Sequence, residues 1–232
     1  MFRIIIRGRN CENYIVRCLN SVLMQDEKFM CTIILDPCTD RTVEIIKSMV
    51  DDRFTIVHNK EKMGLGHNIW YGMQVCGAQP EDICVFLDAD DYLGLNALRV
   101  VNKVYSKKKC LATYGSFVAL STGKLHHWNN KLPKGVNHRE YRFSTSHLKT
   151  VKGKVLSRIP EEYFIHKDKF VPCASDVALM MPVIDLIGTK NLYHVKKKIY
   201  YYNDKNPDSK TREKQKKWKR IVQAKKPLKR MF

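Results

Sequence analysis

Three aspartates fall within four residues of this 232-residue chain, directly after a short apolar run. The run Ile83–Leu87 has the composition of a buried strand, and Asp88, Asp90 and Asp91 follow it. Carboxylates at this spacing repel one another, and a hard divalent cation such as Mn²⁺ or Mg²⁺ relieves that repulsion. The pattern therefore predicts a metal site. Because similar acid pairs also occur in loops that bind nothing, the elements around these residues must be considered as well.

Two further regions place an aspartate between a strand and a helix. Asp36 follows the apolar run Thr32–Leu35, where a carboxylate can accept hydrogen bonds from a base or a ribose hydroxyl. Asp40, in the same loop, can equally cap the helix that follows. Asp176 precedes the apolar stretch Val177–Ile187, where aspartate fills a helix N-cap position well.

The spacing of apolar residues shows which elements must position these acids. Strands are expected at residues 2–6, 32–35, 54–58 and 83–87, and helices over residues 15–23, 43–49 and 69–76. Strands separated by helices predict an α/β fold with a mostly parallel, doubly wound sheet flanked by helices. In such sheets ligands bind beyond the carboxyl ends of the strands, which points to the loops at 7–10, 36–42, 59–68 and 88–92.

After about residue 110 the alternation weakens. The sequence predicts an extended run at residues 112–120, a polar stretch that ends near residue 152, a helix over 176–187 and a strand over 198–202. We therefore expect a smaller set of short strands and one helix to complete the fold.

The formal charge of +19 is unevenly distributed. Residues 1–100 carry a net charge of −3 and residues 101–232 carry +22, of which +10 lies in residues 205–232. A nucleic-acid-binding protein would have such a balance, but that interpretation gives the acids at 88–91 no role, so nucleic acid is the less favoured partner. A basic tail can also bind an anionic membrane surface, or form a solvated, partly helical extension.

The eight cysteines and the lack of a long apolar run bear on location. No two cysteines form a C-x-x-C pair and most lie in apolar runs, so they are predicted to be reduced thiols of the core. No run approaches the roughly 20 apolar residues of a membrane-spanning helix, and the N-terminus lacks the apolar centre of a secretory signal. The expectation is a cytoplasmic protein, peripheral to a membrane if the tail binds lipid.

Four motifs in order carry a resemblance to a known family. They are the segment Arg3–Asn10, the loop Asp36–Thr42, Asn59 with Gly64 and Asn68, and the run Val85–Asp91. This order is similar to that of family 2 glycosyltransferases of the GT-A fold. The second half resembles one bacterial and viral branch of that family: His147–Thr150 is similar to its H-L-R-T segment, Ser175-Asp176 to its W-D element, and Tyr201–Pro207 to its Y-N-D-x-N-P close. The resemblance covers about residues 3 to 207.

The resemblance implies a metal-dependent, inverting transfer of a sugar from a nucleotide diphosphate sugar, expected to be a UDP-sugar. The acceptor would be a hydroxyl of a carbohydrate, a protein glycan or a lipid-linked molecule. By resemblance, Asp90 with Asp88 and Asp91 would bind Mn²⁺ or Mg²⁺, and Asp176 would be the catalytic base. The donor would be bound by Arg7, Gly8, Arg9, Asp36, Gly64, Asn68, Asp88, Ala89, His147 and Lys149.

The same resemblance implies one GT-A domain over residues 1–205, with a nucleotide-sugar half in 1–110 and an acceptor half in 111–205, followed by a basic tail at 206–232. His126, His127 and Trp128 follow a predicted hairpin turn in the acceptor half and could form an aromatic platform for the acceptor, or have an ordinary place on the surface or in the core.

Two loops depart from the family pattern. Arg7 and Arg9 stand where the family more often has proline and small or aromatic residues, and the second loop reads Leu35-Asp36-Pro37-Cys38 where Asp-Asp-Gly-Ser is usual. The identity of the bound base therefore stays open.

Other α/β enzymes fit the sequence less well. A nucleotidyltransferase would also use paired acids and a metal, but it needs a glycine-rich phosphate loop, and the loop at 7–10 has a single glycine. Residues 64–69 resemble the dinucleotide-binding motif G-x-G-x-x-G, but position 69 is Ile where the motif has its third glycine. A dinucleotide-binding dehydrogenase is therefore excluded.

Overall fold

The computed structural model describes residues 1–126, 132–133, 136–141, 145–206 and 212–232. Its centre is a seven-stranded sheet in the order β12-β6-β9-β4-β1-β2-β3. These strands are β1 (Phe2–Gly8), β2 (Phe29–Leu35), β3 (Phe54–His58), β4 (Ile83–Asp88), β6 (Ala112–Gly115), β9 (Ser146–Lys152) and β12 (Leu192–Val195). All are parallel except β9, which runs antiparallel to both β4 and β6.

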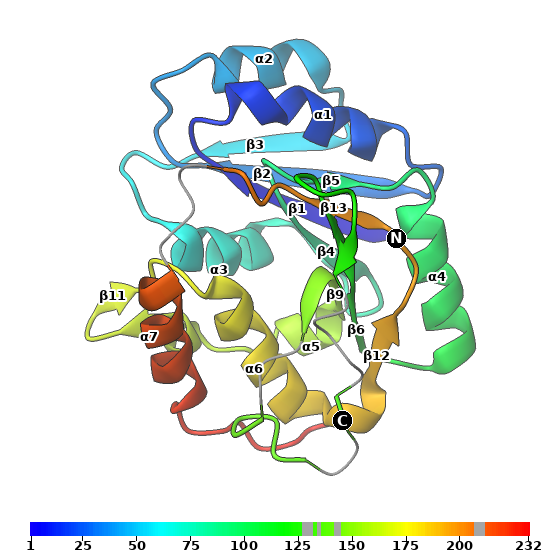
Figure 1. The fold of residues 1–232 in the computed structure, drawn as a ribbon, viewed down its shortest axis with the longest axis vertical. Coiled ribbons are helices and arrows are strands. Elements are labelled where there is room, and N and C mark those ends of the chain that lie inside the picture. The colour runs from blue at the N-terminus through cyan, green and yellow to red at the C-terminus, as the bar shows by residue number, and fades with distance from the viewer. Residues whose placement is uncertain (127–131, 134–135, 142–144, 207–211) are drawn as a thin grey trace.

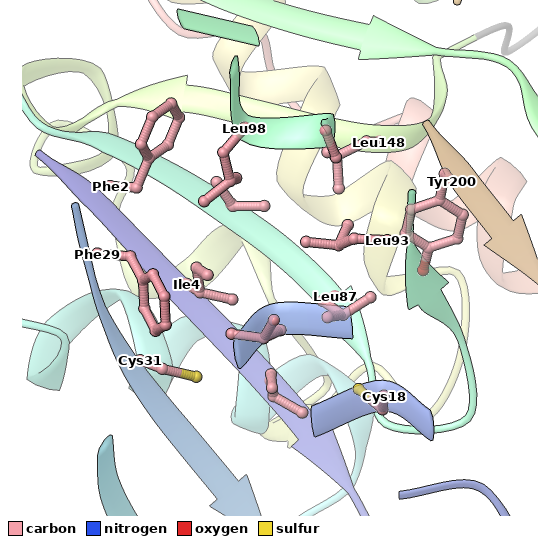
Figure 2. Close-up of a cluster of buried hydrophobic side chains, with 14 of the residues drawn as sticks. Phe2, Ile4, Cys18, Phe29, Cys31, Leu87, Leu93, Leu98, Leu148 and Tyr200 are labelled. Carbon is pink, nitrogen blue, oxygen red and sulfur yellow. The ribbon is translucent and has the colours of Figure 1, made fainter. Parts of the chain in front are cut away.

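Helices cover both faces of the sheet (Figure 1). One face carries α1 (Glu12–Leu23), α2 (Thr42–Met49) and α4 (Ala97–Lys108), and the other carries α3 (Leu65–Val75), α5 (Gly153–Leu156), α6 (Ser175–Ile187) and α7 (Arg212–Gln223). Strand β1 shows why both faces are apolar: Ile4 and Ile6 belong to one buried cluster and Ile5 to the other. Figure 2 shows the first cluster, in which Leu87 and Leu148 lie near Tyr200.

Shorter strands lie beside the main sheet. A four-stranded sheet has the order β5-β13-β7-β8, formed by β5 (Tyr92–Leu93), β13 (Tyr200–Tyr202), β7 (Phe117–Ala119) and β8 (Leu125–His126). Strands β10 (Ile165–His166) and β11 (Lys169–Phe170) form a hairpin, and short 3₁₀ turns span Glu161–Tyr163 and Thr189–Asn191. The pairing of β5 with β13 brings residues 200–206 back to the end of β4.

The expected α/β class with a mostly parallel sheet is confirmed, and so are the predicted strands and helices of the first half. The extended run expected at 112–120 contains two short strands, β6 and β7, which belong to different sheets and are separated at an irregular register beside Gly115. The strand expected over 198–202 is shorter and begins at Tyr200. Helix α4 and strand β9 are additional to the predicted elements. All eight cysteines are free thiols and seven are buried, as predicted.

The C-terminal segment packs against the body of the protein. Helix α7 lies along α6, where Val222 is fully buried and Trp218 packs against the same apolar cluster. Arg139 forms an ion pair with the buried carboxylate of Asp185 in α6 and also donates to the carbonyl oxygens of Gln223 and Lys225. Through these contacts Arg139 connects α6 to the end of α7 and to the chain that follows it. The helices that the structure describes include none that is both apolar enough and long enough to span a bilayer.

Candidate active site

Arg7 and Asp88 meet at the adjoining carboxyl ends of β1 and β4. Arg7 Nε donates to Asp88 Oδ1 at 2.6 Å, and its Nη1 donates to Ser175 Oγ at 2.5 Å and to the carbonyl of Leu65 at 3.3 Å. Burial alone would raise the pKa of Asp88, but the charge and the hydrogen bond of Arg7 outweigh it and lower that pKa to about 2. Asp88 is therefore a fixed anion at neutral pH.

The next two aspartates are held by the returning chain at β13. Asp91 is 1% exposed; it accepts hydrogen bonds from the Tyr200 hydroxyl at 2.5 Å and the Asn203 amide at 2.7 Å. Asp90 Oδ2 accepts one from the side-chain amide of Asn206 at 2.6 Å. Burial and the neighbouring aspartate charges raise the pKa of both carboxyl groups. The repulsion expected from their spacing in the sequence is thus present in the fold.

Strand β9 adds two basic side chains to the same place. Its antiparallel pairing sets Lys149 opposite Phe86 and brings His147 beside the end of β4. Lys149 is 3% exposed, and its Nζ lies 3.2 Å from His147 Nδ1. Burial, with the charge of Lys149, lowers the pKa of His147 well below its usual value, so the imidazole is neutral. Burial also lowers the pKa of Lys149.

A divalent cation fits this donor set. Asp88, Asp91 and His147 each offer one ligand atom, and the three atoms lie within 4.8 Å of one another. A neutral imidazole and ionised carboxylates are the forms that bind metals, and a cation would offset the repulsion that raises the pKa of Asp90. The group contains two of the three acids expected from the sequence, together with His147. No local spacing could have indicated His147 as a metal ligand, because it lies on a distant strand.

Asp176 lies in the first turn of α6, next to the Ser175 whose hydroxyl accepts from Arg7. The N-cap position belongs to Ala174, so Asp176 is not the capping residue that the alternative interpretation required. Its charge acts on both Arg7 and Lys149, which places the candidate base near the acids at the end of β4. The adjacent Ser175, which the sequence analysis named only as part of the W-D-like element, makes the direct contact with Arg7.

A second cluster forms around Asp36 at the end of β2. Asp36 is 4% exposed and accepts hydrogen bonds from the Asn59 side chain and the backbone amides of Met63 and Gly64. Asn59 also donates to Asn68 Oδ1 at 2.7 Å. Gly64 has φ +84°, a conformation that favours glycine, directly before α3. Asp36 therefore anchors the loop between β3 and α3, and its contact with a base stays a prediction.

The remaining predicted residues line the ends of β1 and β4. A Cβ on Gly8 would lie 2.6 Å from the Cβ of Ala89, so the two strands approach closely because Gly8 has no side chain. Arg9 is exposed, and its Nε donates to the Pro37 carbonyl at 3.1 Å. Asp40, the predicted cap, accepts the backbone amides at the starts of both α1 and α2.

An aromatic group borders the acidic cluster. Tyr202 lies close enough for the charges of Asp91, Asp88, Asp90 and Asp176 to act on it, and burial with those charges raises its pKa. Phe117 packs against Tyr202 and stacks on His126 at 5.2 Å between ring centres. His127 and Trp128, the other members of the expected platform, lie outside the described residues.

Solved structures with a similar fold were found. S. aureus TarS matches with a TM-score of 0.66 at 18% identity, covering 87% of this chain and 36% of that protein. TarS 1-349 in complex with UDP matches with a TM-score of 0.67 at 18% identity, covering 87% and 60% of the two chains. TarS 1-349 in complex with UDP-GlcNAc gives 0.67 at 17% identity, covering 89% and 59%. The chain therefore spans at most about 60% of these proteins, and at this identity the likeness concerns the fold.

The sequence comparisons give the family. No curated protein matches the chain. The sequence profile described as Glycosyl transferase family 2 matches residues 4–170, which contain the acids at the end of β4 and the basic residues of β9. The architecture is correspondingly GT-A-like, with a large, mostly parallel sheet between helices. The chain belongs to glycosyl transferase family 2.

Proposed function

We propose that this glycosyltransferase transfers a sugar from a UDP-sugar to an acceptor hydroxyl, with inversion at the anomeric carbon. The observation that carries the proposal is the convergence on Arg7 of two carboxylates with different environments. Asp88 is ion-paired to Arg7 at the end of β4, and Asp176 lies in the first turn of α6, next to the Ser175 that Arg7 contacts. The UDP and UDP-GlcNAc complexes of the structurally similar TarS fragment support UDP as the first nucleotide to test.

The reaction needs a base for the acceptor. In the proposed step the acceptor oxygen attacks the anomeric carbon, the bond from that carbon to the diphosphate oxygen breaks, and the diphosphate leaves with the electron pair. The Asp176 carboxylate takes the acceptor proton as the new bond forms. Lys149, which is buried, and Arg7, whose side chain is 10% exposed, are the basic groups on which the charge of Asp176 acts.

The leaving diphosphate needs positive charge. The proposed metal ligands are Asp88, Asp90 and Asp91, the acids predicted from the sequence. The ligand atoms of Asp88, Asp91 and His147 lie within 4.8 Å of one another, so His147 is a further donor. A bound Mn²⁺ or Mg²⁺ would supply charge neutralisation for the diphosphate. Independently of the ion, we propose that Lys149 and His147, whose charges act on Asp88, hydrogen-bond phosphate oxygens.

Thermal unfolding in the presence of nucleotides tests the proposal. The protein would be heated with UDP, GDP, CDP or dTDP, each with Mn²⁺ or with EDTA, because a ligand of the folded state raises the melting temperature. We expect a metal-dependent rise with UDP that Asp90→Asn abolishes. Release of UDP from UDP-GlcNAc and other UDP-sugars, with water or an added glycan as acceptor, would then identify the sugar.

The same experiment separates the other function classes. No rise with any nucleotide, together with tight and salt-sensitive binding to DNA or RNA, would favour the nucleic-acid interpretation. Release of inorganic diphosphate from a nucleoside triphosphate mixed with a sugar phosphate would favour a nucleotidyltransferase.

The acceptor side suggests a membrane-associated substrate. We propose that the basic C-terminal segment holds the protein at an anionic membrane surface, where a lipid-linked acceptor is available. The apolar side of α7 is packed on α6, and Lys216, Lys217 and Arg220 are exposed, without an acidic partner among the described residues. Such a surface binds anionic headgroups through charge alone.

A further inference from the structure

Arg7 was expected to bind the nucleotide, but its guanidinium is engaged inside the protein. Its Nε bonds to Asp88, and its Nη1 bonds to Ser175 Oγ and to the Leu65 carbonyl. These partners come from the end of β4, the start of α6 and the start of α3. One side chain thus connects three elements that are remote in the sequence and converge on the site.

We propose that Arg7 is a positioning residue: through Ser175 it holds the first turn of α6, and with it Asp176, at a fixed place relative to Asp88. The inference rests on the proposed function, in which Asp88 lies at the diphosphate and Asp176 takes the acceptor proton.

The start of α6 needs such an external contact. The helix begins at Ala174 in the left-handed conformation, φ 57°, and no side chain caps it. The amides of Val177 and Ala178 both bond to the Ala174 carbonyl, so the first turn is formed but not fixed to the sheet by these bonds. The Ser175–Arg7 hydrogen bond supplies that connection.

Arginine suits this role better than lysine. A guanidinium donates in several fixed directions in one plane, so it can bond to Asp88 and Ser175 at once, whereas an ammonium group is a point charge on a flexible stem.

The rest of α6 does not depend on this contact. From Val177 to Ile187 every residue is buried, and α7 packs along the helix. Loss of the Ser175 hydroxyl should therefore leave the fold intact and loosen the first turn alone. A displacement of about 1 Å at a reacting group can lower a rate on the order of 10²-fold, so turnover is the sensitive measurement.

The experiment compares Ser175→Ala, Arg7→Lys and the double variant, with Ser48→Ala and Arg53→Lys on the surface as matched controls. The measurements are UDP affinity, kcat and KM for release of UDP from a UDP-sugar, and amide hydrogen exchange at residues 175–178. For Ser175→Ala we expect about 10-fold lower kcat, an unchanged UDP affinity and faster exchange confined to this turn. The double variant should be no slower than Arg7→Lys alone, because the two residues act through one contact.

The outcomes distinguish this inference from the proposed function. Wild-type protein that neither binds UDP nor releases it from any UDP-sugar would contradict the proposed function, and the exchange measurement would still test the connection between Arg7 and α6. Unchanged kcat and unchanged exchange in Ser175→Ala would overturn the inference, even if Arg7→Lys fails to fold. Weaker UDP affinity in Arg7→Lys, with kcat and exchange unchanged, would show instead that Arg7 binds the nucleotide.

Discussion

Asp88 and Asp91 differ in what their carboxylates contact, although they are three residues apart. Asp88 has a cation beside it and a lowered pKa, whereas Asp91 is buried against a hydroxyl and an amide and has a raised pKa. The sequence predicts that these acids act together, but not which of them has a lowered pKa and which a raised one. That difference depends on their contacts with Arg7 and Tyr200, which lie far from them in the sequence.

Asp176→Asn separates binding from chemistry. Asparagine keeps the shape of the side chain but cannot accept a proton at neutral pH, so kcat should fall about 10²- to 10⁴-fold while the UDP affinity stays unchanged. The measurement is steady-state release of UDP beside UDP titration. Glu161→Gln is the control, since that acid lies in a short turn outside the cluster. Wild-type turnover in Asp176→Asn would contradict the assignment of the base.

Gly8→Ala tests the close approach of β1 and β4. The added methyl would lie 2.6 Å from the Cβ of Ala89, so the strands must separate at the site. We expect a loss of about 1–3 kcal/mol in the free energy of unfolding, measured by urea denaturation. Gly94→Ala is the matched control, because its new methyl would meet neighbours at 3.5 Å, which is ordinary contact. Equal stability of the two variants would contradict the argument.

At the scale of elements, sequence patterns indicate those parts that follow a regular period. Strands β1 to β4 and the helices between them are visible because apolar residues repeat along each one. Strand β9 is hidden, because it buries Lys149 in its middle and is inserted antiparallel between strands that precede it in the chain. The sequence does not show that His147 and Asn206 reach the acids at the end of β4, because this depends on the pairing of β9 with β4 and of β13 with β5.

The docked C-terminal segment gives a prediction for stability. Burial opposes ionisation of Asp185, but contacts from His138, Arg139 and the Leu228 amide outweigh it and lower its pKa. A carboxyl group with a lowered pKa in the folded state stabilises the protein above its unfolded pKa of about 3.9, and this contribution disappears as the pH falls through the folded value. Unfolding in urea between pH 7 and pH 3 should show the loss.

Arg139→Met should remove much of this stabilisation at pH 7. It leaves the buried Asp185 carboxylate without its guanidinium and releases the carbonyls after α7, so we expect a loss of about 3 kcal/mol in the free energy of unfolding. The control is Arg41→Met, whose ion pair with Glu44 is exposed to solvent, so its loss should change stability far less. Similar losses in both variants would contradict a structural role for the C-terminal segment.

At the scale of the whole molecule, charge is separated along the chain. The first 100 residues, which form most of the central sheet, are slightly acidic, and the later residues carry a net charge of +22. Because α7 buries its apolar side, its lysines are available for charge-dependent binding but its apolar residues are not available for insertion into lipid. Any membrane association through α7 should therefore be reversible and sensitive to salt.

Binding to lipid vesicles tests this idea. The wild-type protein is compared with a variant of α7 that carries Lys216→Gln, Lys217→Gln and Arg220→Gln. The control is a variant of α4 that carries Lys103→Gln, Lys107→Gln and Lys108→Gln. Wild-type protein should sediment with phosphatidylcholine–phosphatidylserine vesicles at low salt and not with phosphatidylcholine alone. At about 1 kcal/mol per cation, the α7 variant should bind on the order of 100-fold more weakly. The control has the same net charge, so an equal loss there would show that overall charge, and not the α7 surface, attracts the protein to the membrane. Binding that is unchanged in the α7 variant would reject the membrane proposal and leave family membership and donor binding untouched.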